Sequence, residues 1–280
     1  VVPGIQVLVS DIVPYSKRGR IMGAVEFSWA ATNLFIIPLV GLGIRFLGWQ
    51  APFLYLGLLT VIGMMATWKW FPDHRHAHQP QQRQFRAYLS KLIRNHSALA
   101  VVLSGFFLFI GTESFFITYA AWLEQRFGLG PDQIGLVVGI LGVTEWIGSG
   151  FSSAFIDRLG KRRGVLIGFT LASVVLICLP YLDATIWLAI TGLAIYSLMF
   201  EFTIVSSIPL LSEQMPEARG LTLTMGVLAI SLSRIVMAPV SAWLMESISF
   251  TATCTVGAIG TACGVIVLGL WAKENEERED

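Results

Sequence analysis

Five ionisable side chains stand alone inside long apolar stretches of this sequence. They are four glutamates and one arginine, namely Glu26, Glu113, Glu145, Glu201 and Arg234. A charge at the centre of a bilayer costs at least ~2.5–3.5 kcal/mol, so residues of this kind typically serve an ion, a proton or a substrate. The residue set therefore suggests carboxylates that gain and lose a proton during a transport cycle.

The five positions are not equivalent. Glu26 lies about two turns from the end of its stretch, where it can snorkel or bond a loop. Arg234 stays charged at any ordinary pH, and depth in the helices makes Glu145 or Glu201 its expected partner, with a static ion pair as the alternative. Glu113 has no Lys or Arg on its own stretch, and burial without a cation favours the protonated form. We expect one of the three central glutamates to exchange a proton against substrate, with Arg234 biasing the exchange.

The elements that must hold these residues are membrane-spanning helices. Of 280 residues 55% are hydrophobic and 13% charged, with a mean hydropathy of +0.70, whereas a soluble domain carries about 25% charged residues. A spanning helix needs about 20 apolar residues, and barrel strands would be shorter and alternating. The fold class expected is all-α and multi-pass, because backbone groups in lipid must be bonded within the segment. Eight stretches qualify: 21–44, 46–68, 95–123, 133–156, 164–182, 184–212, 220–245 and 247–272.

Positive charges predict the orientation of these helices. Sixteen of the 19 Lys and Arg residues fall in alternate loops on one side, and only Arg45 and Arg126 fall in loops on the other. The rule that positive loops stay inside places the richer side, with the linker and the C-terminus, in the cytoplasm. The expected location is the cytoplasmic (inner) membrane.

Several functions are not supported by any motif. Neither a metalloprotease, a serine-hydrolase nor a nucleotide-binding signature occurs, so we expect no enzyme, no cofactor and no ATP-driven step. Three cysteines within apolar stretches are interpreted as inert thiols. The histidines His74, His76 and His78 fall in a polar loop and are not expected to bind metal. A net charge of +1 gives no basic field for nucleic acid.

An internal repeat indicates how the helices are grouped. Residues 10–19 read SDIVPYSKRG and residues 212–220 read SEQMPEARG, and Pro38 follows the first copy at the same spacing as Pro239 follows the second. Six apolar stretches separate the copies, so both have the same orientation, as in a parallel repeat of six-helix units. The repeat predicts that the chain lacks three helices and most of a fourth. The expected parts are 1–71 (remainder of the N-terminal bundle), 72–96 (linker with an amphipathic helix at 84–94), 97–272 (C-terminal bundle) and 273–280 (tail).

Loop motifs give the chain a family resemblance. The signature loop of the major facilitator superfamily is similar to DRLGKRRG at 157–164. Further motifs of the family resemble D-x-x-P…R-G at 11–19 and GWQAPF at 48–53. Pro38 and Gly41 resemble the Gly-Pro-x-x-Gly motif of its twelve-helix drug:proton antiporters, with Ile37 in place of the first Gly.

The resemblance implies a gate and a central cavity. The gate would be a latch between two helix ends that forms in one state and breaks in another, although basic loops also serve topology alone. Its candidate residues are Asp157, Arg158, Gly160, Arg162, Asp11 and Arg18. An aromatic wall with few carboxylates suits bulky apolar molecules, although packing must explain at least half of these aromatics. The cavity candidates are Phe109, Phe116, Tyr119, Tyr196, Phe200 and Asn33.

The function expected from these observations is secondary active transport. The resemblance implies proton-coupled efflux of a small hydrophobic molecule by alternating access. A transporter of a polar metabolite or sugar, and a non-transporting sensor of the same fold, are the alternatives. The expected partners are a small-molecule substrate, protons and the lipid bilayer, with the protein acting as a monomer.

Overall fold

The protein is described here from a computed structural model that covers residues 32–70, 82–215 and 218–273. Helices account for nearly all of these residues, which confirms the expected all-α membrane fold. The α-helices are α3 (Ile37–Leu47), α4 (Ala51–Trp70), α5 (Gln82–Arg94), α6 (His96–Phe127), α7 (Pro131–Leu159), α8 (Lys161–Cys178), α9 (Ile186–Glu213), α10 (Arg219–Ser247) and α11 (Phe250–Trp271). A π-helix, Thr32–Ile36, precedes α3, and a short 3₁₀ turn, Leu179–Tyr181, follows α8.

Seven helices in the described part of the chain are long and apolar enough to cross a membrane: α4 and each helix from α6 to α11. Their positions agree with seven of the eight apolar stretches. The remaining stretch, 21–44, is described only from residue 32 onward, where Leu34–Leu47 forms a shorter apolar helix. Many large apolar side chains point outward, among them Trp187 and Ile235 at 73% and 72% exposure. An outer surface of this kind is typical of a protein that is covered by lipid or by further helices rather than by water.

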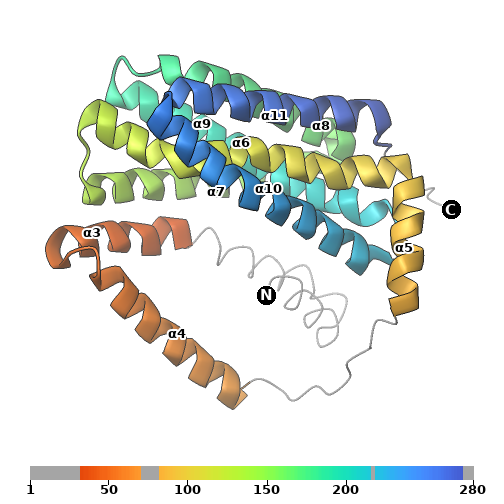
Figure 1. The fold of residues 1–280 in the computed structure, drawn as a ribbon, viewed down its shortest axis with the longest axis horizontal. Coiled ribbons are helices and arrows are strands. Elements are labelled where there is room, and N and C mark those ends of the chain that lie inside the picture. Colours follow the sequence, from red (N-terminus) through yellow and green to blue (C-terminus); the bar gives the residue numbers. More distant parts are fainter. Residues whose placement is uncertain (1–31, 71–81, 216–217, 274–280) are drawn as a thin grey trace.

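Helices α6 to α11 pack side by side as one bundle (Figure 1). Small residues allow α6 and α11 to approach closely, as is common between helices in membranes. A Cβ added at Gly111 on α6 would lie 2.2 Å from Thr261 Oγ1, and one added at Gly260 on α11 would lie 2.2 Å from Ile110 Cγ2. Close packing of α6 fixes its rotation, and this rotation decides where Glu113 points.

Helix α3 contacts the bundle along α7, whereas α4 diverges from it (Figure 1). A Cβ at Gly41 would lie 2.5 Å from the carbonyl oxygen of Pro131, and one at Gly135 would lie 3.2 Å from Pro38 Cα. Arg45 at the end of α3 pairs with Asp132 in the first turn of α7. The contact thus joins the two helices near the start of α7.

Helix α5 lies across the opposite end of the bundle (Figure 1), which we call the basic end because it also carries residues 158–163 and Lys273. The predicted amphipathic helix has a divided apolar face. Tyr88 and Leu92 are buried against α6 and α10, while Leu89 and Ile93 remain exposed. The Tyr88 hydroxyl donates to Thr222 Oγ1 at 3.2 Å, and burial raises the pKa of Tyr88 above its usual value of 10.

Candidate functional site

An ion pair between a buried glutamate and a half-exposed arginine joins α6 and α10. Arg234 Nε is 2.8 Å from Glu113 Oε1, and the Glu113 side chain is 5% exposed while that of Arg234 is 55% exposed. Glu113 has no Lys or Arg near it on its own apolar stretch, but α10 supplies a cation to it, so the expectation of burial without a cation is corrected. The expectation that depth would select Glu145 or Glu201 as the partner of Arg234 is corrected in the same way.

Local packing positions this pair. Helices α6 and α10 contact each other along much of their length, and the hydroxyl groups of Ser241 and Ser114 meet across them at 3.5 Å. Hydroxyl side chains flanking Glu113 donate to carbonyl groups of their own helix, as Thr112 Oγ1 does to Leu108 O at 3.0 Å. The polar groups nearest the carboxylate in the sequence are thus satisfied within α6, and Arg234 supplies its charged partner.

An aromatic patch lies beside the ion pair. The guanidinium carbon of Arg234 is 5.9 Å from the centre of the Phe109 ring. Phe109 and Phe116 on α6 both contact Phe200 on α9, with ring centres 5.9 and 5.5 Å apart and ring planes near 79° and 73°. Phe116 and Phe200 are partly exposed, so the rings of two helices form a small apolar surface next to Arg234.

The two tyrosines predicted for the cavity lie in the interior of the bundle instead. Tyr196 is completely buried, and its ring centre is 4.1 Å from that of Phe115. Tyr119 is 7% exposed and stacks on Phe115 at 5.3 Å. In this conformation both residues pack the interior, so of the five aromatic candidates Phe109, Phe116 and Phe200 are those that gather by the ion pair.

The other two glutamates lie at the contact between α7 and α9. Glu145 is 4% exposed. Glu201 is half-buried, and its Cβ would be 3.3 Å from a Cβ added at Gly148, one turn beyond Glu145. A second acidic region therefore lies where α7 packs against α9.

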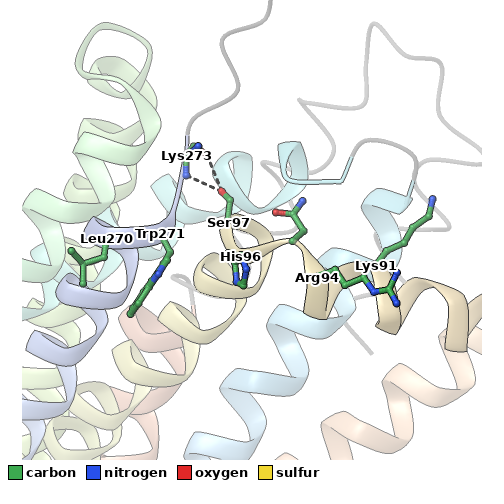
Figure 2. A pocket seen from close by; sticks show the side chains of 8 residues that line it. Lys91, Arg94, His96, Ser97, Leu270, Trp271 and Lys273 are labelled. Atoms are coloured by element: carbon green, nitrogen blue, oxygen red, sulfur yellow. Dashed lines mark hydrogen bonds between the residues drawn. The ribbon is translucent and has the colours of Figure 1, made fainter.

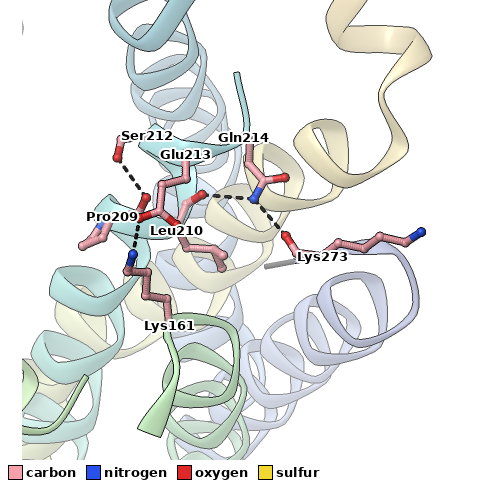
Figure 3. Close-up of polar contacts among 7 residues, drawn as sticks. All are labelled: Lys161, Pro209, Leu210, Ser212, Glu213, Gln214 and Lys273. Atoms are coloured by element: carbon pink, nitrogen blue, oxygen red, sulfur yellow. Dashed lines mark hydrogen bonds and ion pairs between the residues drawn. The ribbon is translucent and has the colours of Figure 1, made fainter. Parts of the chain in front are cut away.

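The gating loop is described in part. Gly160 connects α7 to α8 at φ 85°, a conformation that favours glycine and allows the chain to reverse at once. Lys161 pairs with Glu213 at the end of α9 (Figure 3), and Arg162 Nη2 donates to the carbonyl of Gly269 at 2.7 Å. Arg158 is exposed. The loop thus binds the ends of α9 and α11.

Several predicted residues lie outside the part of the chain that the structure describes. These are Asp11, Arg18, Glu26, the three histidines of the linker, and the side chains of Asn33 and Asp157. The predicted latch between two helix ends, for which Asp157, Asp11 and Arg18 are candidates, therefore remains a prediction. Among the residues that are described, no three His, Cys, Asp or Glu side chains are grouped to hold a metal ion.

Sequence reasoning missed the contact of α3 with α7. Asp132 follows Pro131 at the beginning of α7, and acidic residues are favoured in the first turn of a helix. Arg45 was noted as one of only two basic residues on its side of the membrane. Taken together, these two signals could have suggested the ion pair.

Comparisons with known proteins agree with this architecture. A family model described as Major Facilitator Superfamily matches residues 1–120 and 101–280. The uncharacterized MFS-type transporter YwfA of Bacillus subtilis (strain 168) is 30% identical over 255 residues, which cover 85% of this chain and 60% of that protein. The uncharacterized MFS-type transporter YceJ of the same organism is 26% identical over 185 residues, covering 65% of this chain and 46% of that protein. The chain therefore spans about half to three-fifths of the length of these relatives.

A solved structure shows the same fold. The crystal structure of a D-xylose-proton symporter matches with a TM-score of 0.77 over 96% of this chain and 67% of that chain. Sequence identity is 16%, so the likeness concerns the arrangement of helices alone.

Proposed function

Because the chain belongs to the major facilitator superfamily of membrane transporters, we propose that it serves proton-coupled export of a small hydrophobic molecule by alternating access. The observation that supports this most is the ion pair of Glu113 and Arg234 beside the aromatic patch of Phe109, Phe116 and Phe200. A carboxyl group that pairs with Arg234 next to an apolar surface on the helices α6, α9 and α10 supports a proton-exchange role for Glu113.

The charge of this region depends on whether Glu113 holds a proton. When Glu113 is ionised, its charge and that of Arg234 cancel, and an apolar molecule can cover the region without leaving a net charge in a dry environment. When Glu113 is protonated, Arg234 remains as an uncompensated cation, and covering it with an apolar molecule is unfavourable. A neutral apolar substrate and a proton therefore exclude each other, which is the requirement for antiport.

The same reasoning defines the alternative. An anionic substrate would bind Arg234 best when Glu113 is protonated, and substrate and proton would then move together. The direction of proton movement on adding substrate thus separates export of a neutral apolar molecule from uptake of a charged, polar one. A sensor that does not transport would move no protons with either class.

The test uses inverted membrane vesicles that contain the full-length protein and an acid-sensitive dye. With an acidic lumen, adding the neutral apolar antibiotic chloramphenicol is expected to release protons through the wild-type protein. Glu113→Gln should abolish this release while the protein still reaches the membrane. Glu124→Gln is the matched control, because Glu124 lies exposed near the end of the same helix.

Three results would contradict the proposal. A Glu113→Gln variant with wild-type proton release would remove Glu113 from the mechanism. Proton entry on adding an anionic substrate would favour the symport alternative. The absence of proton movement with neutral and anionic compounds alike would favour the sensor.

A further inference from the structure

An open cavity at the basic end lies apart from the region around Glu113. It has a volume of about 690 Å³ and is formed where α5 turns into α6 and where α11 ends (Figure 2). Its walls are mainly basic or aromatic: Lys91, Arg94, Asn95, His96, Ser97, Leu270, Trp271 and Lys273.

Hydrogen bonds fix the framework of this cavity. The backbone N–H of Lys273 donates to Ser97 Oγ at 2.8 Å, and the Ser97 hydroxyl donates to Gln214 Oε1 at 2.6 Å. Gln214 Nε2 in turn donates to the carbonyl of Lys273 at 3.1 Å (Figure 3), and Asn95 caps the start of α6. The end of α11, the end of α9 and the start of α6 are thereby held together, so the cavity has a defined shape.

The charge of the cavity favours an anion. Lys91, Arg94 and Lys273 supply three cations, and none of the described residues that line the cavity is acidic. Within the described part of the chain, the side chains of Arg94 and Lys273 form no ion pair with a carboxylate. The positive end of the α6 dipole also faces this region. Two cations without a carboxylate partner among the described residues, at one opening, suit a phosphate group.

An apolar groove continues from the cavity along the outer face of the bundle. This second hollow, of about 220 Å³, shares His96 and Trp271 with the first. The rest of its lining is aliphatic and belongs to α6 and α11: Leu99, Ala100, Leu103 and Val267. Leu103 is 39% exposed and Trp271 50% exposed on a surface that faces lipid. A free phosphate would leave this groove empty, whereas a hydrocarbon chain would fill it.

We propose that the cavity and the groove together bind one anionic phospholipid from the leaflet at the basic end. The lipid phosphate contacts Arg94 and Lys273, and an acyl chain lies between α6 and α11 against Leu103 and Val267. Trp271 stands at the junction of headgroup and chain, as tryptophan does at membrane interfaces. The positive-inside distribution assigns this leaflet to the cytoplasmic side, where anionic lipids attract basic residues. This site is independent of the proposed transport mechanism.

The test measures lipid retention by native mass spectrometry of the full-length protein in detergent, titrated with phosphatidylglycerol or phosphatidylcholine. The wild-type protein is expected to retain one phosphatidylglycerol at least tenfold more tightly than phosphatidylcholine. Arg94→Gln with Lys273→Gln should weaken retention by about 30-fold, since each surface cation contributes about 1 kcal/mol. The matched control is Arg163→Gln with Arg219→Gln, which removes two exposed cations of the same end from outside the cavity.

A second variant examines the groove separately. Leu103→Trp fills the apolar hollow without changing any charge, and it should weaken phosphatidylglycerol retention while leaving competition by inorganic phosphate unchanged. Unaltered helix content and monodispersity of each variant are checked by circular dichroism and size-exclusion chromatography. Equal retention of the two lipids, or equal losses in the cavity and control variants, would overturn the proposal. Complete displacement by millimolar phosphate together with no effect of Leu103→Trp would show a simple anion site instead.

Discussion

The ion pair of Glu113 and Arg234 should respond very differently to loss of one partner or the other. Arg234→Gln leaves a carboxylate that is 5% exposed without its cation, whereas Glu113→Gln leaves a guanidinium group that is 55% exposed and can be solvated. Removing one partner of a buried pair costs about 3–5 kcal/mol when the remaining charge stays buried. A partner that reaches solvent limits the loss to about 1 kcal/mol. We therefore expect Arg234→Gln to lower the free energy of unfolding by about 2 kcal/mol or more beyond Glu113→Gln.

A double-mutant cycle measures this difference. The full-length protein and its variants are unfolded by SDS titration from mixed micelles, and helix content is followed by circular dichroism. The Glu113→Gln, Arg234→Gln double variant should be more stable than Arg234→Gln alone, because it no longer contains a buried uncompensated charge. Arg126→Gln is the control, since its pair with Asp183 at 2.9 Å is exposed on both sides and should contribute less than about 1 kcal/mol.

The reasoning would be refuted by either of two results. One is a Glu113→Gln variant that is as unstable as Arg234→Gln. The other is a double variant less stable than Arg234→Gln alone. Either result would mean that Arg234 does not compensate the buried carboxylate, and the proposed dependence of the site's charge on Glu113 would lose its basis.

Two further predictions concern packing and pH. Gly148→Ala places a Cβ 2.6 Å from the carbonyl oxygen of Leu198 and should destabilise the protein by about 1–3 kcal/mol, measured as a lower thermal unfolding midpoint. Gly150→Ala, whose Cβ meets nothing within 4 Å, should be nearly neutral, and equal effects of the two variants would contradict the close contact of α7 and α9. Burial raises the pKa of Tyr88, so the stabilising contribution of the neutral tyrosine is fully present below pH 10, the pKa in the unfolded state, and is lost as pH rises through the pKa in the folded state. Tyr88→Phe should therefore lose less stability at alkaline pH than the wild type, and an unchanged pH profile would contradict this assignment.

Helix positions could be predicted from the sequence because length and polarity determine them. A stretch that must cross hydrocarbon has about 20 apolar residues and ends at charges, so the boundaries of α9 and α10 agree with the stretches 184–212 and 220–245 to within two residues. This signal is one-dimensional, since it gives depth along a helix but not rotation about the helix axis. Rotation decides that Arg234 meets Glu113 and that Tyr196 is buried.

The nature of the surface that each apolar face contacts could not be predicted either. The period of apolar residues in α5 correctly indicated a helix, but lipid and protein satisfy such a face equally well. Tyr88 and Leu92 are covered by α6 and α10, a fact that depends on where those helices end. Similarly, the sequence does not decide whether an aromatic residue near a glutamate is buried. Phe200 is partly exposed, whereas Tyr196, four residues earlier on α9, is completely buried.

Tight seating of Gly41 against the backbone of Pro131 has a mechanical consequence. Helices α3 and α7 touch backbone to backbone here, and the ion pair of Arg45 and Asp132 lies beside the contact. The two helices therefore have little freedom to slide, and their relative motion becomes a rotation about the contact. Across the ~30 Å of a bilayer, a turn of about 10° around such a fulcrum displaces the far ends by about 5 Å. Small angular changes at this contact would thus become displacements of several ångströms at the basic end, which is the kind of movement that the proposed alternating access requires.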